Sequence, residues 1–338
     1  MSGRNRSAPQ PGSSRCRGVV MKYRKLGRSG LKISEISLGG WTTFAASVRD
    51  PETIRTIVSL AFSAGVNFFD MADVYASGEA ERQIGSVLRE FPRHHLVLSS
   101  KVYFPMSKDP NDRGLSRKHV HESVRQSLQR LQTNYLDLYF AHRYDSDVAI
   151  EEVVRAFSDL VSQGLVLYWG TSEWPASAIQ EAFELARRNG WHPPTVEQAE
   201  YSLLRRHRVE RELFPASAKT GLGLVVWSPL AQGLLTGKYD EGISEDTRFA
   251  RLPQFTQRLW SEKNVQRVKK MRAIAENAAL TRAQLALAWV LTKRQLTSAI
   301  TGATRVEQLE ENLKAAEAQL APETVSLLEE LFPSSVED

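Results

Sequence analysis

Four ionisable residues of this sequence stand where proton-transfer chemistry could be assembled. Asp70, Lys101 and His142 each end a short apolar run of strand length. Tyr75 follows the first of these by five residues. Any one of them alone is explained as a strand terminus or a loop cap. Because the active sites of β/α barrels gather at the carboxyl ends of the strands, their occurrence at three successive strands predicts one site of proton transfer.

The elements that would position these residues alternate between strand and helix from residue 36 onward. The expected strands are 36–39, 67–70, 96–101, 135–142, 165–170, 195–200, 222–227 and 298–300, and expected helices include 51–64, 79–90, 175–188 and a final one at 306–315. Eight such strands predict an α/β fold, a closed (β/α)8 TIM barrel. An N-terminal β-hairpin at residues 23–33 is expected to plug its bottom. Long loops at 102–115 and 228–262 would leave the catalytic end.

The alternative fold is an open, doubly wound sheet. To bind a dinucleotide, such a sheet would need a G-x-G-x-x-G turn after an early strand. The sequence contains no such turn, so the barrel is favoured.

Composition narrows the class of protein. The chain has 338 residues, 42% of them hydrophobic, and a net charge of +5. Residues 1–20 hold four arginines and no acid, so we expect a disordered basic tail there, a nearly neutral barrel domain over 21–338, and no nucleic-acid-binding face. No apolar run approaches the roughly 20 residues needed to cross a bilayer, so no membrane insertion is expected. The single cysteine, Cys16, fits a reducing, cytoplasmic location.

Several motifs together resemble the aldo-keto reductase superfamily. The resemblance is closest to the branch that contains the β subunits of voltage-gated potassium channels and related bacterial reductases. It extends over residues 23–331. The segments that carry it are 68–75, 98–101, 113–119, 168–172, 197–201, 227–231 and 308–312.

The resemblance implies a catalytic tetrad of Asp70, Tyr75, Lys101 and His142. The implied reaction is transfer of a hydride from NADPH to an aldehyde or ketone carbon, with a proton delivered to the carbonyl oxygen. A phenol of pKa about 10 donates poorly unless its phenolate is stabilised. We therefore expect the Lys101 ammonium to make Tyr75 more acidic by Coulomb attraction. Asp70 would hold Lys101, and His142 would orient the substrate oxygen.

The resemblance also implies a set of residues that bind NADPH or NADP+. They are Trp41, Ser172, Gln198, Trp227, Ser228, Pro229, Leu230, Gly233, Lys238, Arg248, Gly302, Thr304, Arg305, Gln308, Glu311 and Asn312. Ser172 and Gln198 would grip the nicotinamide carboxamide, and Trp227 would stack on its ring. The loop after strand seven would line the pyrophosphate. Backbone N–H groups at the start of the last helix would favour the 2′-phosphate.

The preference for NADPH over NADH depends on two candidate positive charges, Arg248 and Arg305. Glu173 stands where the family usually has a polar or basic side chain. Asp73 lies in the site loop and receives no role. Trp41, Tyr103, Phe104 and Trp174 would form an apolar mouth for a small carbonyl substrate.

Two further functions are alternatives to a reductase. The first is an NADPH-binding, redox-sensing regulatory subunit of a membrane partner. The channel β subunits tend to carry asparagine where this chain has His142, which favours turnover. The second is a barrel hydrolase, which would need a metal cluster or a carboxylate pair. The seven histidines and the cysteine show no metal-ligand spacing. The resemblance also admits a homo-oligomer.

Overall fold

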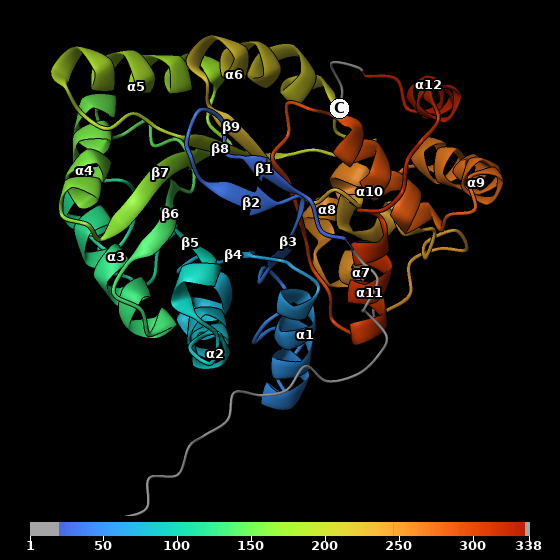
Figure 1. Cartoon of the computed structure of the whole chain (residues 1–338), viewed down its shortest axis with the longest axis horizontal. Coiled ribbons are helices and arrows are strands. Elements are labelled where there is room, and N and C mark those ends of the chain that lie inside the picture. The colour runs from blue at the N-terminus through green and yellow to red at the C-terminus, as the bar shows by residue number, and fades with distance from the viewer. Residues whose placement is uncertain (1–19, 246, 335–338) are drawn as a thin grey trace, which may run out of the picture.

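The barrel is closed by eight parallel strands (Figure 1). The computed structural model describes residues 20–245 and 247–334. The barrel strands are β3 (Ile36–Gly39), β4 (Phe68–Asp70), β5 (Val97–Val102), β6 (Leu136–Ala141), β7 (Val166–Ser172), β8 (Val196–Glu200), β9 (Gly223–Trp227) and β10 (Ser298–Thr301). The last strand pairs with both β9 and β3, with Ala299 opposite Ile36. The predicted TIM barrel is confirmed, and each strand boundary lies within two residues of its prediction.

Helices surround the barrel and cover its outer face (Figure 1). They are α1 (Pro51–Ser63), α2 (Glu79–Leu88), α3 (Arg117–Leu131), α4 (Ile150–Ser162), α5 (Ala176–Asn189), α6 (Phe214–Thr220), α7 (Arg248–Arg251), α8 (Pro253–Leu259), α9 (Glu262–Asn277), α10 (Arg282–Thr292), α11 (Val306–Lys314) and α12 (Pro322–Leu331). In α3, for example, Ser116 caps the first turn by accepting a hydrogen bond from His119 N. The buried stripe of that helix includes Val120 and Val124, one helical turn apart.

An antiparallel hairpin of β1 (Tyr23–Lys25) and β2 (Lys32–Ser34) closes the amino-terminal end of the barrel. In Figure 1 it lies in front of the barrel strands. Its Leu26 and Ile33 join the same apolar cluster as the interior residues Phe68 and Leu138. Gly27 has φ +55°, and a Cβ there would lie 2.3 Å from the carbonyl oxygen of Gly221. Only glycine lets the turn approach the barrel this closely, so the predicted plug is confirmed.

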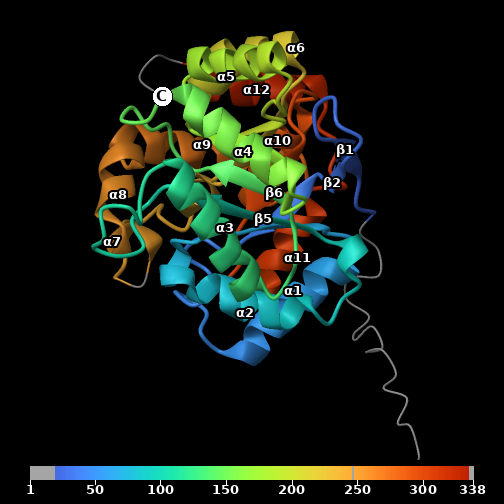
Figure 2. The same cartoon turned by 90° about the vertical axis from the view of Figure 1, so that its left-hand side faces the viewer.

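The opposite end, which we call the rim, carries the carboxyl ends of the barrel strands and the longer connections. Two 3-10 turns lie there, η1 (Tyr75–Gly78) after β4 and η4 (Ala231–Thr236) after β9. Figure 2 shows α7 and α8 at the end of the molecule away from the hairpin. The loop expected at 228–262 therefore contains η4, α7 and α8.

Some elements were missed by the sequence prediction. The sequence predicts helix 306–315 as the final one, but α12 follows it, and the prediction lacks α9 and α10, which lie between β9 and β10. A further turn, η2 (Arg93–His95), precedes β5, and a π-helical turn, η3 (Val209–Leu213), precedes α6. The predicted tail at 1–20 lies outside the described residues except for Val20. Among the described residues, no helix is both long and apolar enough to cross a bilayer.

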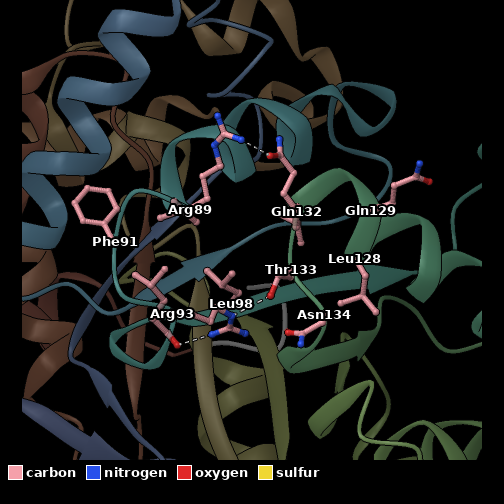
Figure 3. Close-up of a pocket in the computed structure, with 12 residues that line it drawn as sticks. Arg89, Phe91, Arg93, Leu98, Leu128, Gln129, Gln132, Thr133 and Asn134 are labelled. Carbon is pink, nitrogen blue, oxygen red and sulfur yellow. Dashed lines mark hydrogen bonds between the residues drawn. The ribbon is translucent and has the colours of Figure 1, made fainter. Parts of the chain in front are cut away.

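An open pocket lies on the outside of the barrel where α2 and α3 end (Figure 3). Two arginines in it are held by local hydrogen bonds, Arg89 to Gln132 and Arg93 to Thr133. Because these helices end next to the amino-terminal ends of the strands, the pocket lies at the end opposite the rim. It is therefore separate from the site described next.

Candidate active site

Lys101 is the centre of the rim and is fully buried. Its Nζ donates to Asp70 Oδ2 at 2.7 Å and to Tyr75 Oη at 3.1 Å. The third donation goes to the carbonyl oxygen of Met71 at 2.7 Å. An ammonium has three N–H donors, so Lys101 is saturated and held in one orientation, with the Tyr75 hydroxyl beside its charge.

Asp70, at the end of β4, is held by side chains of two other strands, β5 and β8. Besides Lys101 on β5, its Oδ1 accepts from Ser99 Oγ at 2.7 Å and from Gln198 Nε2 at 3.0 Å. The carboxylate is therefore satisfied on both oxygens although it is buried. These hydrogen bonds fix the position of the Asp70 carboxylate, and the carboxylate in turn fixes the position of the Lys101 ammonium.

Burial and neighbouring charges shift the pKa values of both Lys101 and Tyr75. Burial alone would lower the pKa of the Lys101 ammonium, but Asp70 and the Tyr75 oxygen outweigh it and raise that pKa. Burial raises the pKa of the Tyr75 phenol above its ordinary value, and Lys101 only partly offsets this. Lys101 thus lowers the pKa of Tyr75, as expected, but desolvation of the phenolate raises it by more, so the net shift is upward. The phenol is thus protonated at neutral pH, as a proton donor must be.

His142 stands next to Tyr75, with ring centroids 6.0 Å apart and nearly perpendicular planes. On its other side lies the ring of Phe104, at 5.0 Å. Burial, together with the charges of Lys101 and Arg143, holds the pKa of His142 well below its ordinary value, so the imidazole is neutral. Its Nδ1 is buried and has no hydrogen-bond partner among the described residues. A neutral imidazole can donate to a substrate oxygen without carrying a charge into the site.

Asp73, which received no role from the sequence, fixes the loop that presents Tyr75. Its Oδ1 accepts from Val74 N at 2.6 Å, and its Oδ2 accepts from Ser123 Oγ on α3 at 2.9 Å. The hydroxyl of Tyr139 donates to the same serine. Burial, and then the nearby charge of Glu81, raises the pKa of Asp73 to about 7. The contact with Ser123 spans 50 residues of sequence, so no local pattern could have revealed it.

The expected nicotinamide residues lie on adjacent strand ends. Ser172 at the end of β7 is in register with Gln198 on β8. The amide nitrogen of Gln198 is engaged by Asp70, whereas its Oε1 accepts no hydrogen bond within residues 20–245 and 247–334. That oxygen remains free to accept from a carboxamide.

Trp227 is the aromatic residue at the end of β9, and Glu173 holds it. The indole Nε1 donates to Glu173 Oε1 at 2.8 Å, and Arg208 pairs with the other carboxylate oxygen at 2.9 Å. Glu173, which departs from the family pattern, therefore anchors the ring expected to stack on the cofactor. Trp41 packs edge-on against Trp227, at 6.1 Å between centroids. Phe255 of α8 packs on Trp41 at 5.3 Å, so these rings form one wall of the rim.

The segment after Trp227 turns back on itself through left-handed backbone. Ser228, Ala231, Gln232 and Gly233 have φ values of 58°, 48°, 58° and 92°, while Pro229 and Leu230 lie within the turn. Gln232 Nε2 donates to Ser228 Oγ at 2.6 Å, and Gln232 Oε1 accepts from Arg248 at 3.2 Å. This strained turn is held by its own side chains.

Three cations come together beside this turn, and we call Lys238, Arg248 and Arg305 the cation cluster. A Cβ on Gly233 would lie 2.7 Å from Lys238 Nζ, and one on Gly302 would lie 4.0 Å from Arg248 Nη2. Partial burial, then the charges of Arg248 and Arg305, lowers the pKa of Lys238 to about 8. No member of the cluster forms an ion pair with a carboxylate of the described residues. Uncompensated positive charge of this kind fits a polyphosphate ligand.

The remaining expected residues lie at the amino-terminal end of α11. Arg305 is the N-cap of that helix and makes no side-chain cap hydrogen bond. Instead, Gln308 Oε1 accepts from both Thr304 N and Thr304 Oγ1, each at 2.9 Å. Glu311 is partly exposed and Asn312 is buried one turn further on. Backbone N–H groups at this helix end favour an anion, and the cation cluster lies beside it.

Comparisons with known proteins cover the same barrel. The family model described as "Aldo/keto reductase family" matches residues 35–332. A protein of Oryza sativa subsp. japonica named "Probable voltage-gated potassium channel subunit beta" is 42% identical over 321 residues, which are 93% of this chain and 97% of that protein. A protein of Arabidopsis thaliana with the same name has the same identity and coverage. The family model includes every residue of the rim described above.

Proposed function

The chain belongs to the aldo/keto reductase family of oxidoreductases, and we propose from this premise that it reduces aldehydes and ketones to alcohols with NADPH. The observation that carries the proposal is the geometry at Lys101. A saturated, fully buried ammonium lies 3.1 Å from the Tyr75 hydroxyl, and a neutral His142 packs edge-on against the Tyr75 ring.

The proposed division of labour follows from these positions. Bound NADPH supplies the hydride that is transferred to the carbonyl carbon. Tyr75 donates its proton to the carbonyl oxygen, and Lys101 stabilises the phenolate that remains. At 3.1 Å and an effective dielectric constant of about 20, that attraction is worth about 5 kcal/mol for a full phenolate. Asp70 keeps Lys101 charged and in place, and His142 donates a hydrogen bond that orients the carbonyl oxygen.

The residues of the rim fit a dinucleotide with an additional phosphate. The anchored ring of Trp227 offers a flat apolar surface, and the free oxygen of Gln198 offers an acceptor for a carboxamide. The cation cluster has more positive charge than a pyrophosphate alone requires, which supports NADPH over NADH. Each of these contacts is formed by this chain's own side chains, so each can be tested by substitution.

A multiple-turnover assay tests the proposed activity. Purified protein is mixed with NADPH and a series of reactive aromatic and aliphatic aldehydes, and oxidation of the cofactor is followed by its near-ultraviolet absorbance. We expect the alcohol to accumulate far beyond one equivalent of protein. Oxidation that stops at one equivalent or below would contradict the proposal.

A second candidate function rests on the relatives, which are named as probable channel β subunits. In that case the chain would bind NADPH as a regulatory subunit of a membrane partner and turn over slowly. The neutral His142 beside Tyr75 favours the reductase, because it supplies a donor for the carbonyl oxygen. The same assay separates the two functions, since tight NADPH binding without sustained turnover would support the regulatory subunit.

A further inference from the structure

Arg143 lies beside the reacting end of the site and has no part in the proposed chemistry. It follows His142 in the loop after β6 and is partly exposed. Its Nη1 donates to the carbonyl oxygen of His142 at 2.5 Å. Its guanidinium carbon lies 5.4 Å from the centroid of the Phe104 ring, and that ring packs on His142. The cation therefore lies beside the Phe104 ring, which packs on His142, and His142 in turn packs on Tyr75.

The charge of Arg143 is uncompensated, unlike that of most partly buried arginines in this fold. Its Nε and Nη2 have no partner among the described residues, and no carboxylate there pairs with it. The nearby Asp145 is already engaged by Leu115 N and Asp147 N. The partly buried arginines that do have carboxylate partners include Arg24 with Glu35, Arg93 with Asp137 and Arg208 with Glu173, and the buried Arg130 pairs with Glu81.

Two other partly buried arginines also lack a carboxylate partner in the described part of the chain. Arg248 belongs to the cation cluster, where a phosphate is the proposed counter-ion. Arg267 lies on the outer helix α9. Arg143 is therefore the member of this group that adjoins the catalytic residues. Its field reaches them, since it contributes to the lowered pKa of His142 and opposes the raised pKa of Tyr75.

We propose that Arg143 binds the carboxylate of the substrate, so that the preferred substrates are aldehydes carrying a carboxylate away from the reacting carbonyl. The inference rests on the proposed reductase function. Nε and Nη2 form one edge of the guanidinium, and this edge matches the two oxygens of a carboxylate. Phe104 would support the carbon skeleton between the two groups, and the carboxylate would supply the missing counter-charge. Arg143 would therefore determine specificity and would take no part in proton transfer.

A matched pair of substrates tests this proposal. The probes are 4-carboxybenzaldehyde and its neutral methyl ester, and the measured quantity is the ratio of their kcat/KM values. Comparing this ratio between variants cancels the intrinsic reactivity of each aldehyde. Loss of a charge-assisted hydrogen bond predicts that Arg143→Met lowers the acid-to-ester ratio by about tenfold or more. Arg143→Lys keeps the positive charge but loses the two parallel N–H donors of the guanidinium, so it should lower the ratio less.

The control variant is Arg188→Met in the last turn of α5, which removes the same charge at the end of the barrel opposite the rim. It should leave the ratio unchanged. If Arg143→Met reduces turnover of both aldehydes equally, the arginine only supports His142 and the proposal is overturned. An equal change in the Arg188→Met variant would also overturn it, since net charge would then explain the effect.

A binding measurement separates this proposal from the proposed function. Benzoate and methyl benzoate are titrated against the protein with NADPH present, and binding is followed by tryptophan fluorescence. We expect Arg143→Met to raise the Kd of benzoate by about tenfold and to change that of the ester little. This outcome without turnover of either aldehyde would retain the Arg143 site and contradict the reductase function. If the protein turns over both aldehydes but its Kd for benzoate is the same in wild type and Arg143→Met, the reductase function is retained and the Arg143 site is contradicted.

Discussion

Substitution of Lys101 by methionine should separate the chemistry of the site from its stability. The variant removes the ammonium 3.1 Å from the Tyr75 oxygen. A full phenolate would lose about 5 kcal/mol of stabilisation at an effective dielectric constant of about 20. If the proton is about half transferred in the transition state, the barrier rises by half that amount. We therefore expect Lys101→Met to lower kcat by about 100-fold.

The same variant leaves the Asp70 carboxylate buried without its counter-ion. Removing one member of a buried ion pair typically costs about 3–5 kcal/mol, so the free energy of unfolding should also fall. The double variant Asp70→Asn, Lys101→Met removes the orphaned charge. The asparagine oxygen can still accept from Ser99 and Gln198, so stability should recover while turnover stays low.

The assay combines three measurements on the wild-type chain and both variants. Turnover is followed through cofactor oxidation with a saturating aldehyde, NADPH binding through its fluorescence, and stability through chemical denaturation. Lys118→Met serves as the control, because Lys118 forms an exposed ion pair with Glu122 on α3 and should matter little. Turnover within tenfold of wild type in Lys101→Met, or its recovery in the double variant, would refute the reasoning.

Two further predictions concern the phosphate region and the site loop. Arg305→Ala should raise the KM for NADPH more than that for NADH in steady-state kinetics, and equal effects on both would mean that Arg305 does not contact the 2′-phosphate. Asp73 has a pKa of about 7 in the folded chain against 3.8 without burial, so the folded state binds its proton more tightly and wild-type stability falls as pH rises from about 4 to about 7. The Asp73→Asn variant lacks this pH-dependent contribution to the free energy of unfolding. At about 1.4 kcal/mol per pKa unit, the contribution is at most a few kcal/mol. The wild-type minus variant difference in the free energy of unfolding should therefore decrease over that range, and a flat difference would contradict it.

The barrel could be predicted because most of its strands are short runs rich in apolar residues, and β4, β5 and β6 each end at or beside an ionisable residue. Parallel strands buried on both faces have this pattern. Helices α9 and α10 lack an equally clear one. In α10 the run Leu285–Val290 is buried without interruption, so no polar face alternates with it. The capping box of Thr281 and Gln284 was the available signal.

Site residues could be predicted only where their position relative to the end of a strand is visible in the local sequence. The positions of Asp70, Lys101 and Tyr75 relative to strand ends predicted that they would meet. The direction of the Tyr75 pKa could not be predicted, because it depends on how far the phenol is buried. Glu173 likewise gained its role through Trp227, which lies 54 residues away. Arg143 gave no signal at all, since the absence of a carboxylate partner is visible only in three dimensions.

The most direct test of the account is the turnover of the Tyr75→Phe variant with NADPH and a reactive aldehyde. The substitution removes the proposed proton donor and leaves Lys101, Trp227 and the cation cluster unchanged. We predict that NADPH binding, measured by fluorescence, is retained while kcat falls by about 10²–10⁴-fold. Turnover close to that of the wild-type chain would contradict the assignment of Tyr75 as the acid.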